Sequence, residues 1–165
     1  MSHWLNKVLV IGLGLIGGSL AKSLREQRVC ANVVGFDRDQ REMQEGLRLG
    51  VIDSMAENLA EEVASADLVV LAVPVKATEA VLEQIKPFLT PSTILTDVGS
   101  TKGNVVEAAE RVFGRLPVGF VPGHPIAGSE KSGVAAADSQ LFNGYKVILT
   151  PLPDSADEAT ARVEE

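Results

Sequence analysis

The chain has 165 residues, 45% apolar and 22% charged, a balance typical of one globular domain with its own core. Its net charge of −7 argues against nucleic acid and anionic membranes as partners, since both favour a basic surface. A single cysteine, Cys30, excludes an internal disulfide, and no leader or membrane-length apolar run is visible, so we expect a cytoplasmic protein with Cys30 packed in its interior.

Short runs rich in Val, Ile and Leu alternate with amphipathic segments of helical spacing. The runs are almost continuously apolar, as in parallel strands that are covered on both faces. Gly50 and Gly114 are suited to ending two of the helices. We expect strands at 7–12, 32–36, 66–74, 92–99, 118–121 and 145–151, and helices at 17–27, 39–50, 76–89 and 102–114. This alternation predicts an α/β fold with a Rossmann-type, doubly wound, mostly parallel sheet.

The first strand runs into a glycine-rich turn with the spacing G-x-G-x-x-G. In this pattern the first glycine permits a tight turn, the second lets a pyrophosphate approach the backbone, and the third lets the helix pack on the strand. A strand before it and a helix after it give the motif the context of a dinucleotide site. The predicted cofactor contacts are Gly12, Gly14, Leu15, Ile16, Gly17, Val73, Pro74 and Ser100, with Asp37 and Arg38 at the ribose.

The choice between NAD and NADP depends on the end of the second strand. The carboxylate of Asp37 can accept hydrogen bonds from a ribose hydroxyl and repel a 2′-phosphate, which favours NAD. The neighbouring Arg38 could instead pair with that phosphate, so NADP stays possible. A third interpretation is that Asp37 only caps the following helix.

Two polar stretches, 96–103 and 123–133, follow later strands, where open α/β sheets bind ligands. The second contains His124, one of two histidines in the chain, on a segment that Pro125 keeps out of helical geometry. Histidine is the side chain that titrates near neutral pH. We therefore expect Ser100, Lys102 and His124 to converge over the nicotinamide half of the cofactor. No metal site is expected, and His3 and Trp4 are expected to be incidental.

Three stretches together resemble the prephenate and arogenate dehydrogenases of tyrosine biosynthesis: the glycine-rich segment 12–19, Asp97-x-Gly99-Ser100-x-Lys102, and the run from His124 to Glu130. The resemblance implies a nucleotide-binding domain at 1–153. The tail 154–165 is expected from its own residues to begin a helix capped by Asp154 or Ser155. The resemblance implies that this helix leads to a missing helical domain. That domain would complete the substrate site and make the full-length protein a homodimer.

The implied reaction is an NAD-dependent oxidative decarboxylation of a small-molecule substrate, prephenate or arogenate or both. Hydride leaves ring C4, the C4 hydroxyl loses its proton, and loss of CO₂ makes the ring aromatic. The resemblance gives His124 the role of base, Ser100 that of orienting the hydroxyl or the imidazole, and Glu130 that of tying its loop to the substrate. Charge alone suggests that Lys102 or Lys131 attracts the anionic substrate.

Each of these residues also has a plainer interpretation. His124 could be a surface or packing residue, Ser100 the N-cap of the helix near Lys102, and Glu130 a solvated carboxylate. The whole chain could be a nucleotide-binding module without turnover, or a reductase related to β-hydroxyacid dehydrogenases.

Overall fold

The computed structural model describes residues 5–165, so His3 and Trp4 lie outside the described residues. Its centre is a six-stranded parallel sheet in the order β3-β2-β1-β4-β5-β6, which confirms the predicted Rossmann-type fold. The strands are β1 (Leu5–Ile11), β2 (Cys30–Phe36), β3 (Ser54–Met55), β4 (Leu68–Leu71), β5 (Ile94–Asp97) and β6 (Phe120–Val121).

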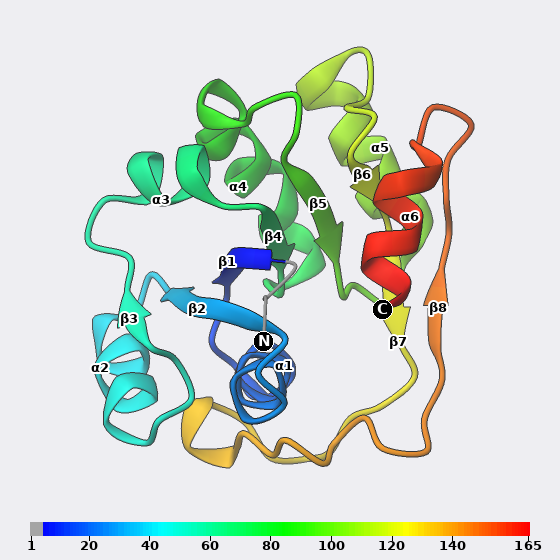
Figure 1. The fold of residues 1–165 in the computed structure, drawn as a ribbon. Coiled ribbons are helices and arrows are strands. Elements are labelled where there is room, and N and C mark those ends of the chain that lie inside the picture. Colours follow the sequence, from blue (N-terminus) through cyan, green and yellow to red (C-terminus); the bar gives the residue numbers. More distant parts are fainter. Residues whose placement is uncertain (1–4) are drawn as a thin grey trace.

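Helices cover both faces of this sheet (Figure 1). On one face lie α1 (Leu15–Glu26) and α2 (Gln40–Arg48), and on the other lie α3 (Leu59–Ser65), α4 (Thr78–Ile85) and α5 (Lys102–Phe113). The 3₁₀ turns η1 (Val75–Ala77) and η2 (Lys86–Phe88) flank α4, and η3 (Val134–Ala136) packs against α1 and α2. Within residues 5–165, no helix is both long and apolar enough to cross a membrane.

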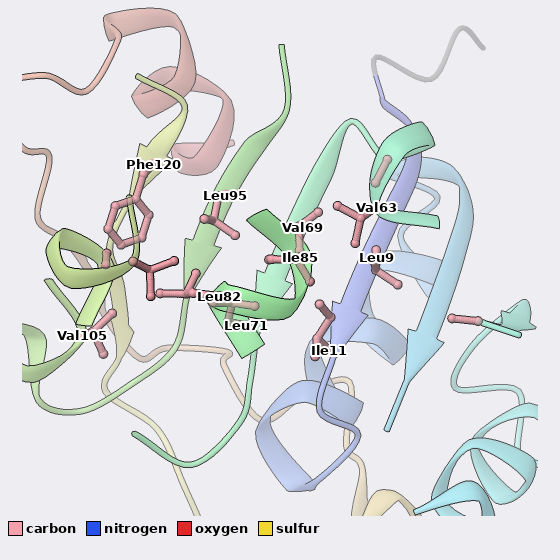
Figure 2. Packing of buried hydrophobic residues seen from close by; sticks show 14 of the residues in the cluster. Leu9, Ile11, Val63, Val69, Leu71, Leu82, Ile85, Leu95, Val105 and Phe120 are labelled. Atoms are coloured by element: carbon pink, nitrogen blue, oxygen red, sulfur yellow. The ribbon is translucent and has the colours of Figure 1, made fainter. Parts of the chain in front are cut away.

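The apolar runs of β1, β2 and β4 are continuous because each of these strands contributes to two cores. In β1, Leu9 and Ile11 belong to the cluster under α3, α4 and α5, whereas Val8 and Val10 belong to the cluster under α1 and α2. Figure 2 shows the first cluster as one layer that runs from β1 across the sheet to Phe120 of β6. Burial on both faces is therefore the reason why no polar alternation appears in these strands.

The predicted helix ends at glycine are confirmed. Gly50 has φ 71° after α2, and Gly114 has φ 69° after α5. After α2, the N–H of Val51 donates to the carbonyl of Gly46 at 2.8 Å, and the N–H of Gly50 donates to that of Leu47 at 3.2 Å. This pair of bonds is a Schellman cap, which satisfies two of the last carbonyls of the helix.

The expected strand at 145–151 is not part of the parallel sheet. Its central residues form β8 (Val147–Leu149), which pairs antiparallel with β7 (Gly123–Pro125) in a separate two-stranded sheet. His124 therefore lies in a short strand opposite Ile148, which agrees with the expected non-helical segment and adds a partner strand that the sequence did not predict. The apolar run predicted a strand correctly, but it could not show which strand would be its partner.

The C-terminal helix α6 (Asp157–Glu164) forms as expected and lies beside β6 (Figure 1). Its predicted caps are wrong, because the N-cap is Ala156, which makes no side-chain cap. The hydroxyl of Ser155 donates instead to the carbonyl of Phe120 at 2.7 Å and accepts from the N–H of Leu152 at 2.9 Å. Ser155 thus ties the start of the tail to β6.

The short elements β3 and α3 were among those absent from the sequence-based expectation. β3 has two residues, and α3 has seven with only Val63 fully buried, too short for a recognisable helical period. Asn58 caps α3 by accepting a hydrogen bond from the N–H of Glu61 at 3.3 Å. That cap and the acidic residues Glu61 and Glu62 in the first turn were the local signals for the helix.

Cys30 is buried at the start of β2, as expected, with 6% of its surface exposed. Burial, together with the nearby charge of Asp53, raises the pKa of the Cys30 thiol from 9.0 to about 11. The thiolate is the reactive form of cysteine. The folded protein therefore keeps this thiol inert.

We expect the free energy of unfolding to fall between pH 9 and 11, because the unfolded thiol ionises in this range while the folded thiol stays protonated. The contribution is about 2 kcal/mol at the upper end. Urea unfolding of the protein and of Cys30→Ala across this range measures it. Other alkaline titrations are common to both proteins, so parallel pH profiles would contradict the assignment.

Candidate active site at the carboxyl edge of the sheet

The glycine turn after β1 is shaped by two close backbone approaches. Gly12 has φ 101°, and a Cβ there would overlap the carbonyl of Ala72. A Cβ on Gly17 would overlap the carbonyl of Gly12. A Cβ on Gly14, by contrast, would have no atom within 4 Å. The first and third glycines are therefore required by the fold, whereas Gly14 leaves free space at the turn.

The same turn opens α1 toward that space. Gly14 is the N-cap of α1, makes no side-chain cap, and is followed by a first turn without acidic residues. Leu15 and Ile16 are half-buried in this turn. A helix N-terminus with backbone N–H groups and a positive dipole end suits an anionic group such as a phosphate. The turn therefore fits the diphosphate of a dinucleotide.

Asp37 lies just beyond β2 and is brought to the glycine turn. Its carboxylate accepts hydrogen bonds from the N–H of Leu13 at 2.8 Å and from that of Asp39 at 2.9 Å. The helix-cap interpretation of Asp37 is wrong, because Asp39 caps α2 by accepting from the N–H of Arg41 at 3.0 Å. Each carboxylate oxygen of Asp37 has a further lone pair for a ligand hydroxyl. Arg38 is exposed beside it.

The turn after β4 connects the glycine turn to the loop after β5. The N atom of Val73 lies 3.1 Å from the position that a Cβ on Gly12 would occupy, and Pro74 is exposed at the start of η1. Further along, the Cγ2 atom of Val75 lies 3.4 Å from the corresponding position at Gly99. The two halves of the carboxyl edge are thus in contact.

Asp97, the last residue of β5, joins the two polar stretches. Its side chain is 3% exposed. One carboxylate oxygen accepts from the N–H of Gly123 at 3.1 Å, and the other accepts from the N–H of Gly99 at 2.9 Å and from Lys102 Nζ. The sequence analysis assigned no role to Asp97, although an acidic residue at the end of an apolar strand was a visible signal.

Lys102 forms an ion pair with Asp97. Its side chain is 17% exposed and donates to Asp97. Burial lowers the pKa of the Lys102 ammonium below its ordinary value, and the hydrogen bond and charge of Asp97 act in the opposite direction. The suggestion that Lys102 is a free cation for an anionic substrate is therefore wrong. Lys131, exposed on the 126–133 segment, keeps that possibility.

The remaining predicted catalytic residues differ in their exposure and in the hydrogen bonds near them. Ser100 is exposed between β5 and α5 and is not a helix cap, since the N-cap of α5 is Thr101. His124 is half-buried in β7, and it follows Gly123, whose N–H donates a hydrogen bond to Asp97. Glu130 is exposed, and in residues 5–165 no hydrogen bond joins it to Ser100 or His124. Asp97 thus binds the backbone of the residue before Ser100 and of the residue before His124, whereas no hydrogen bond of the described residues ties Glu130 to either.

A cavity of about 530 Å³ lies away from these residues. It lies between α1, one face of the sheet, the β7–β8 pair and the end of α6. Its lining includes Asp97 and Gly123 but not the glycine turn, Asp37, Ser100 or His124. The candidate site is therefore the open edge of the sheet, where ligands of doubly wound folds bind.

Known proteins resemble this chain over most of its length. The family model described as prephenate dehydrogenase, nucleotide-binding domain, matches residues 20–165. A prephenate dehydrogenase from Lactococcus lactis is 43% identical over 147 residues, which are 88% of this chain and 41% of that protein.

Two solved structures are similar over nearly the whole chain. The prephenate dehydrogenase of Aquifex aeolicus in complex with hydroxyphenyl propionate and NAD⁺ has a TM-score of 0.88 at 35% identity, covering 99% of this chain and 57% of that one. The Synechocystis arogenate dehydrogenase has a TM-score of 0.85 at 32% identity, covering 96% of this chain and 54% of that one. The chain therefore spans about half the length of the proteins it matches.

The three glycines of the turn should respond differently to alanine. We expect Gly12→Ala and Gly17→Ala each to lower the free energy of unfolding by more than about 2 kcal/mol, because each added Cβ overlaps backbone. Gly14→Ala should change it by less than about 1 kcal/mol, since its Cβ meets open space. Urea unfolding followed by circular dichroism measures all three, and equal losses would contradict this division.

Proposed function

Because the chain belongs to the prephenate dehydrogenase nucleotide-binding domain family, we propose that it holds NAD and half of an active site for oxidising prephenate, arogenate or both. The observation that carries the proposal is the arrangement of the carboxyl edge: Val73 lies beside Gly12, Val75 beside Gly99, and Asp97 bonds both Gly99 and Gly123. A fitting phosphate site and the residue before His124 therefore lie along the same edge.

The chain's own residues account for cofactor binding. Gly14 and the first turn of α1, with Leu15, Ile16 and Gly17, hold the diphosphate. Asp37 accepts the ribose hydroxyls, and Val73 and Pro74 border the cofactor on the β4 side. The bound cofactor supplies a hydride acceptor. In support, the similar Aquifex aeolicus enzyme was solved in complex with NAD⁺.

NAD is the preferred cofactor in this proposal. Asp37 is fixed by two backbone N–H groups, so its negative charge cannot swing away from a 2′-phosphate. NADP binding would require Arg38, which is exposed beside Asp37, to offset that repulsion. The position of Asp37 therefore favours the ribose hydroxyl.

We expect the chain to bind NAD about 10-fold or more tightly than NADP, and Asp37→Asn to remove most of this preference by losing a charge-assisted hydrogen bond. Titration calorimetry with both nucleotides measures the preference. Asp67→Asn is the matched control, because Asp67 also accepts two backbone N–H groups, of Asn6 and Lys7, just before β4 at the opposite edge. An unchanged preference in Asp37→Asn would contradict the role of Asp37.

The chemistry is divided between His124 and Ser100. The imidazole of His124 accepts the proton of the C4 hydroxyl, which favours departure of hydride from the same carbon. Ser100, exposed at the end of β5, orients the hydroxyl or the imidazole. Loss of CO₂ then makes the ring aromatic. Glu130 and Lys131, both exposed, contact the substrate from the 126–133 segment, Glu130 at the side chain and Lys131 by its charge.

The homodimer and the helical domain implied by the resemblance remain predictions, as do the domain bounds 1–153 and 154–165 and a cytoplasmic location. The alternative function, a nucleotide-binding module, is separated by one assay. If the 165-residue chain binds NAD but forms no NADH from prephenate or arogenate, the module describes this chain. If NADH accumulates, the chain contains a sufficient active site.

We expect His124→Asn in the full-length gene product to lower kcat by about 10²–10⁴-fold, the usual contribution of a positioned base. NADH formation from each substrate measures it. Affinity for NAD serves as the internal control. It should not change, because the groups proposed to hold NAD are the glycine turn and Asp37, and His124 is not one of them. Near-normal turnover would remove His124 from the mechanism.

A further inference from the structure

The main sheet ends its regular pairing just before His124. Thr96 and Val121 form the last pair between β5 and β6, and the next residue, Pro122, has no N–H to continue the ladder. Two side chains take over from the backbone. The hydroxyl of Thr96 donates to the carbonyl of Val121 at 2.7 Å, and the carboxylate of Asp97 accepts from the N–H of Gly123 at 3.1 Å.

The second oxygen of the same carboxylate holds the other polar stretch. It accepts from the N–H of Gly99 at 2.9 Å and from Lys102 Nζ. Gly99 directly precedes Ser100, and Gly123 directly precedes His124. One buried side chain therefore fixes the backbone immediately before both proposed catalytic residues.

We propose that Asp97 is a positioning residue that sets the separation of His124 and Ser100 at the carboxyl edge. This inference rests on the proposed function, since it assigns Asp97 to that same site. Asp97 itself is buried and its oxygens already bind protein groups, so it acts through the two loops rather than on substrate. An error of about 1 Å in the placement of such groups can lower a rate by about 10²-fold.

Asparagine cannot reproduce this arrangement. Its amide has one acceptor oxygen, and its NH₂ group would face an N–H donor, so either the Gly99 or the Gly123 segment loses its acceptor. Asp97→Asn alone would also leave the buried Lys102 ammonium without a counter-charge and destabilise the fold. The double variant Asp97→Asn/Lys102→Met removes both charges and so separates positioning from ion pairing.

The test uses the NMR signal of the His124 imidazole in the 165-residue chain. The sequence has two histidines, so the signal is identified by its loss in His124→Asn. In the wild-type chain and in Asp67→Asn, saturating NAD should shift this signal. In the double variant, NAD should bind with unchanged affinity while the shift is lost. In the full-length gene product, the same variant should lower kcat by about 10²-fold with an unchanged KM for NAD.

Each result has a separate meaning. A double variant whose His124 signal shifts like that of the wild type overturns the positioning role and leaves the proposed function intact. A double variant that fails to fold or to bind NAD also overturns it, because Asp97 then serves the fold or the cofactor site. A wild-type chain that binds NAD with no shift of the His124 signal contradicts the proposed function itself.

Discussion

The arrangement of this domain depends on the contact between the backbones of Gly12 and Gly17. The chain must turn within a few residues after β1, and α1 must then cross directly over that turn. Neither is possible with a side chain at these positions, since a Cβ would overlap carbonyl groups. The close crossing points the N-terminus of α1 at the carboxyl edge and leaves space beside Gly14. The phosphate site and the packing of α1 are therefore consequences of one steric constraint.

The other half of the edge is organised by charge instead of by close packing. β6 contributes only two residues to the sheet, and Pro122 prevents it from continuing. A buried carboxylate, that of Asp97, supplies the acceptor that the backbone ladder no longer provides. A buried charge is costly unless it is paired and hydrogen-bonded, and Lys102 with two backbone N–H groups meets that requirement. One half of the edge is thus a closely packed backbone turn, and the other is built around the fully hydrogen-bonded carboxylate of Asp97.

The features that sequence could predict are those with a local physical cause. Apolar runs predicted β1, β2, β4 and β5, and in β1, β2 and β4 burial on both faces explains why the runs are continuous. Features decided by distant partners were not predictable. The run at 145–151 forms β8 because β7 is its pairing partner. Ser155, expected to cap α6, donates its hydroxyl to the carbonyl of Phe120 instead. Asp97 was visible as the end of a strand, but its role required knowing that Gly123 returns to the same point.

The proposed site residues differ in whether hydrogen bonds hold them in place, and this difference matches the roles proposed for them. Hydrogen bonds between separate elements hold Asp37 and the backbone beside His124, and a local bond from Gly99 to Asp97 holds the backbone beside Ser100. The 126–133 segment is anchored at its ends, where Ile126 donates to Lys146 at 2.8 Å and Val134 donates to Glu42 at 2.6 Å. Between these anchors, Glu130 and Lys131 are exposed. Proton transfer requires fixed geometry, whereas attraction of an anionic substrate tolerates mobile charges. The held residues therefore suit the chemical step, and the exposed segment suits substrate recognition.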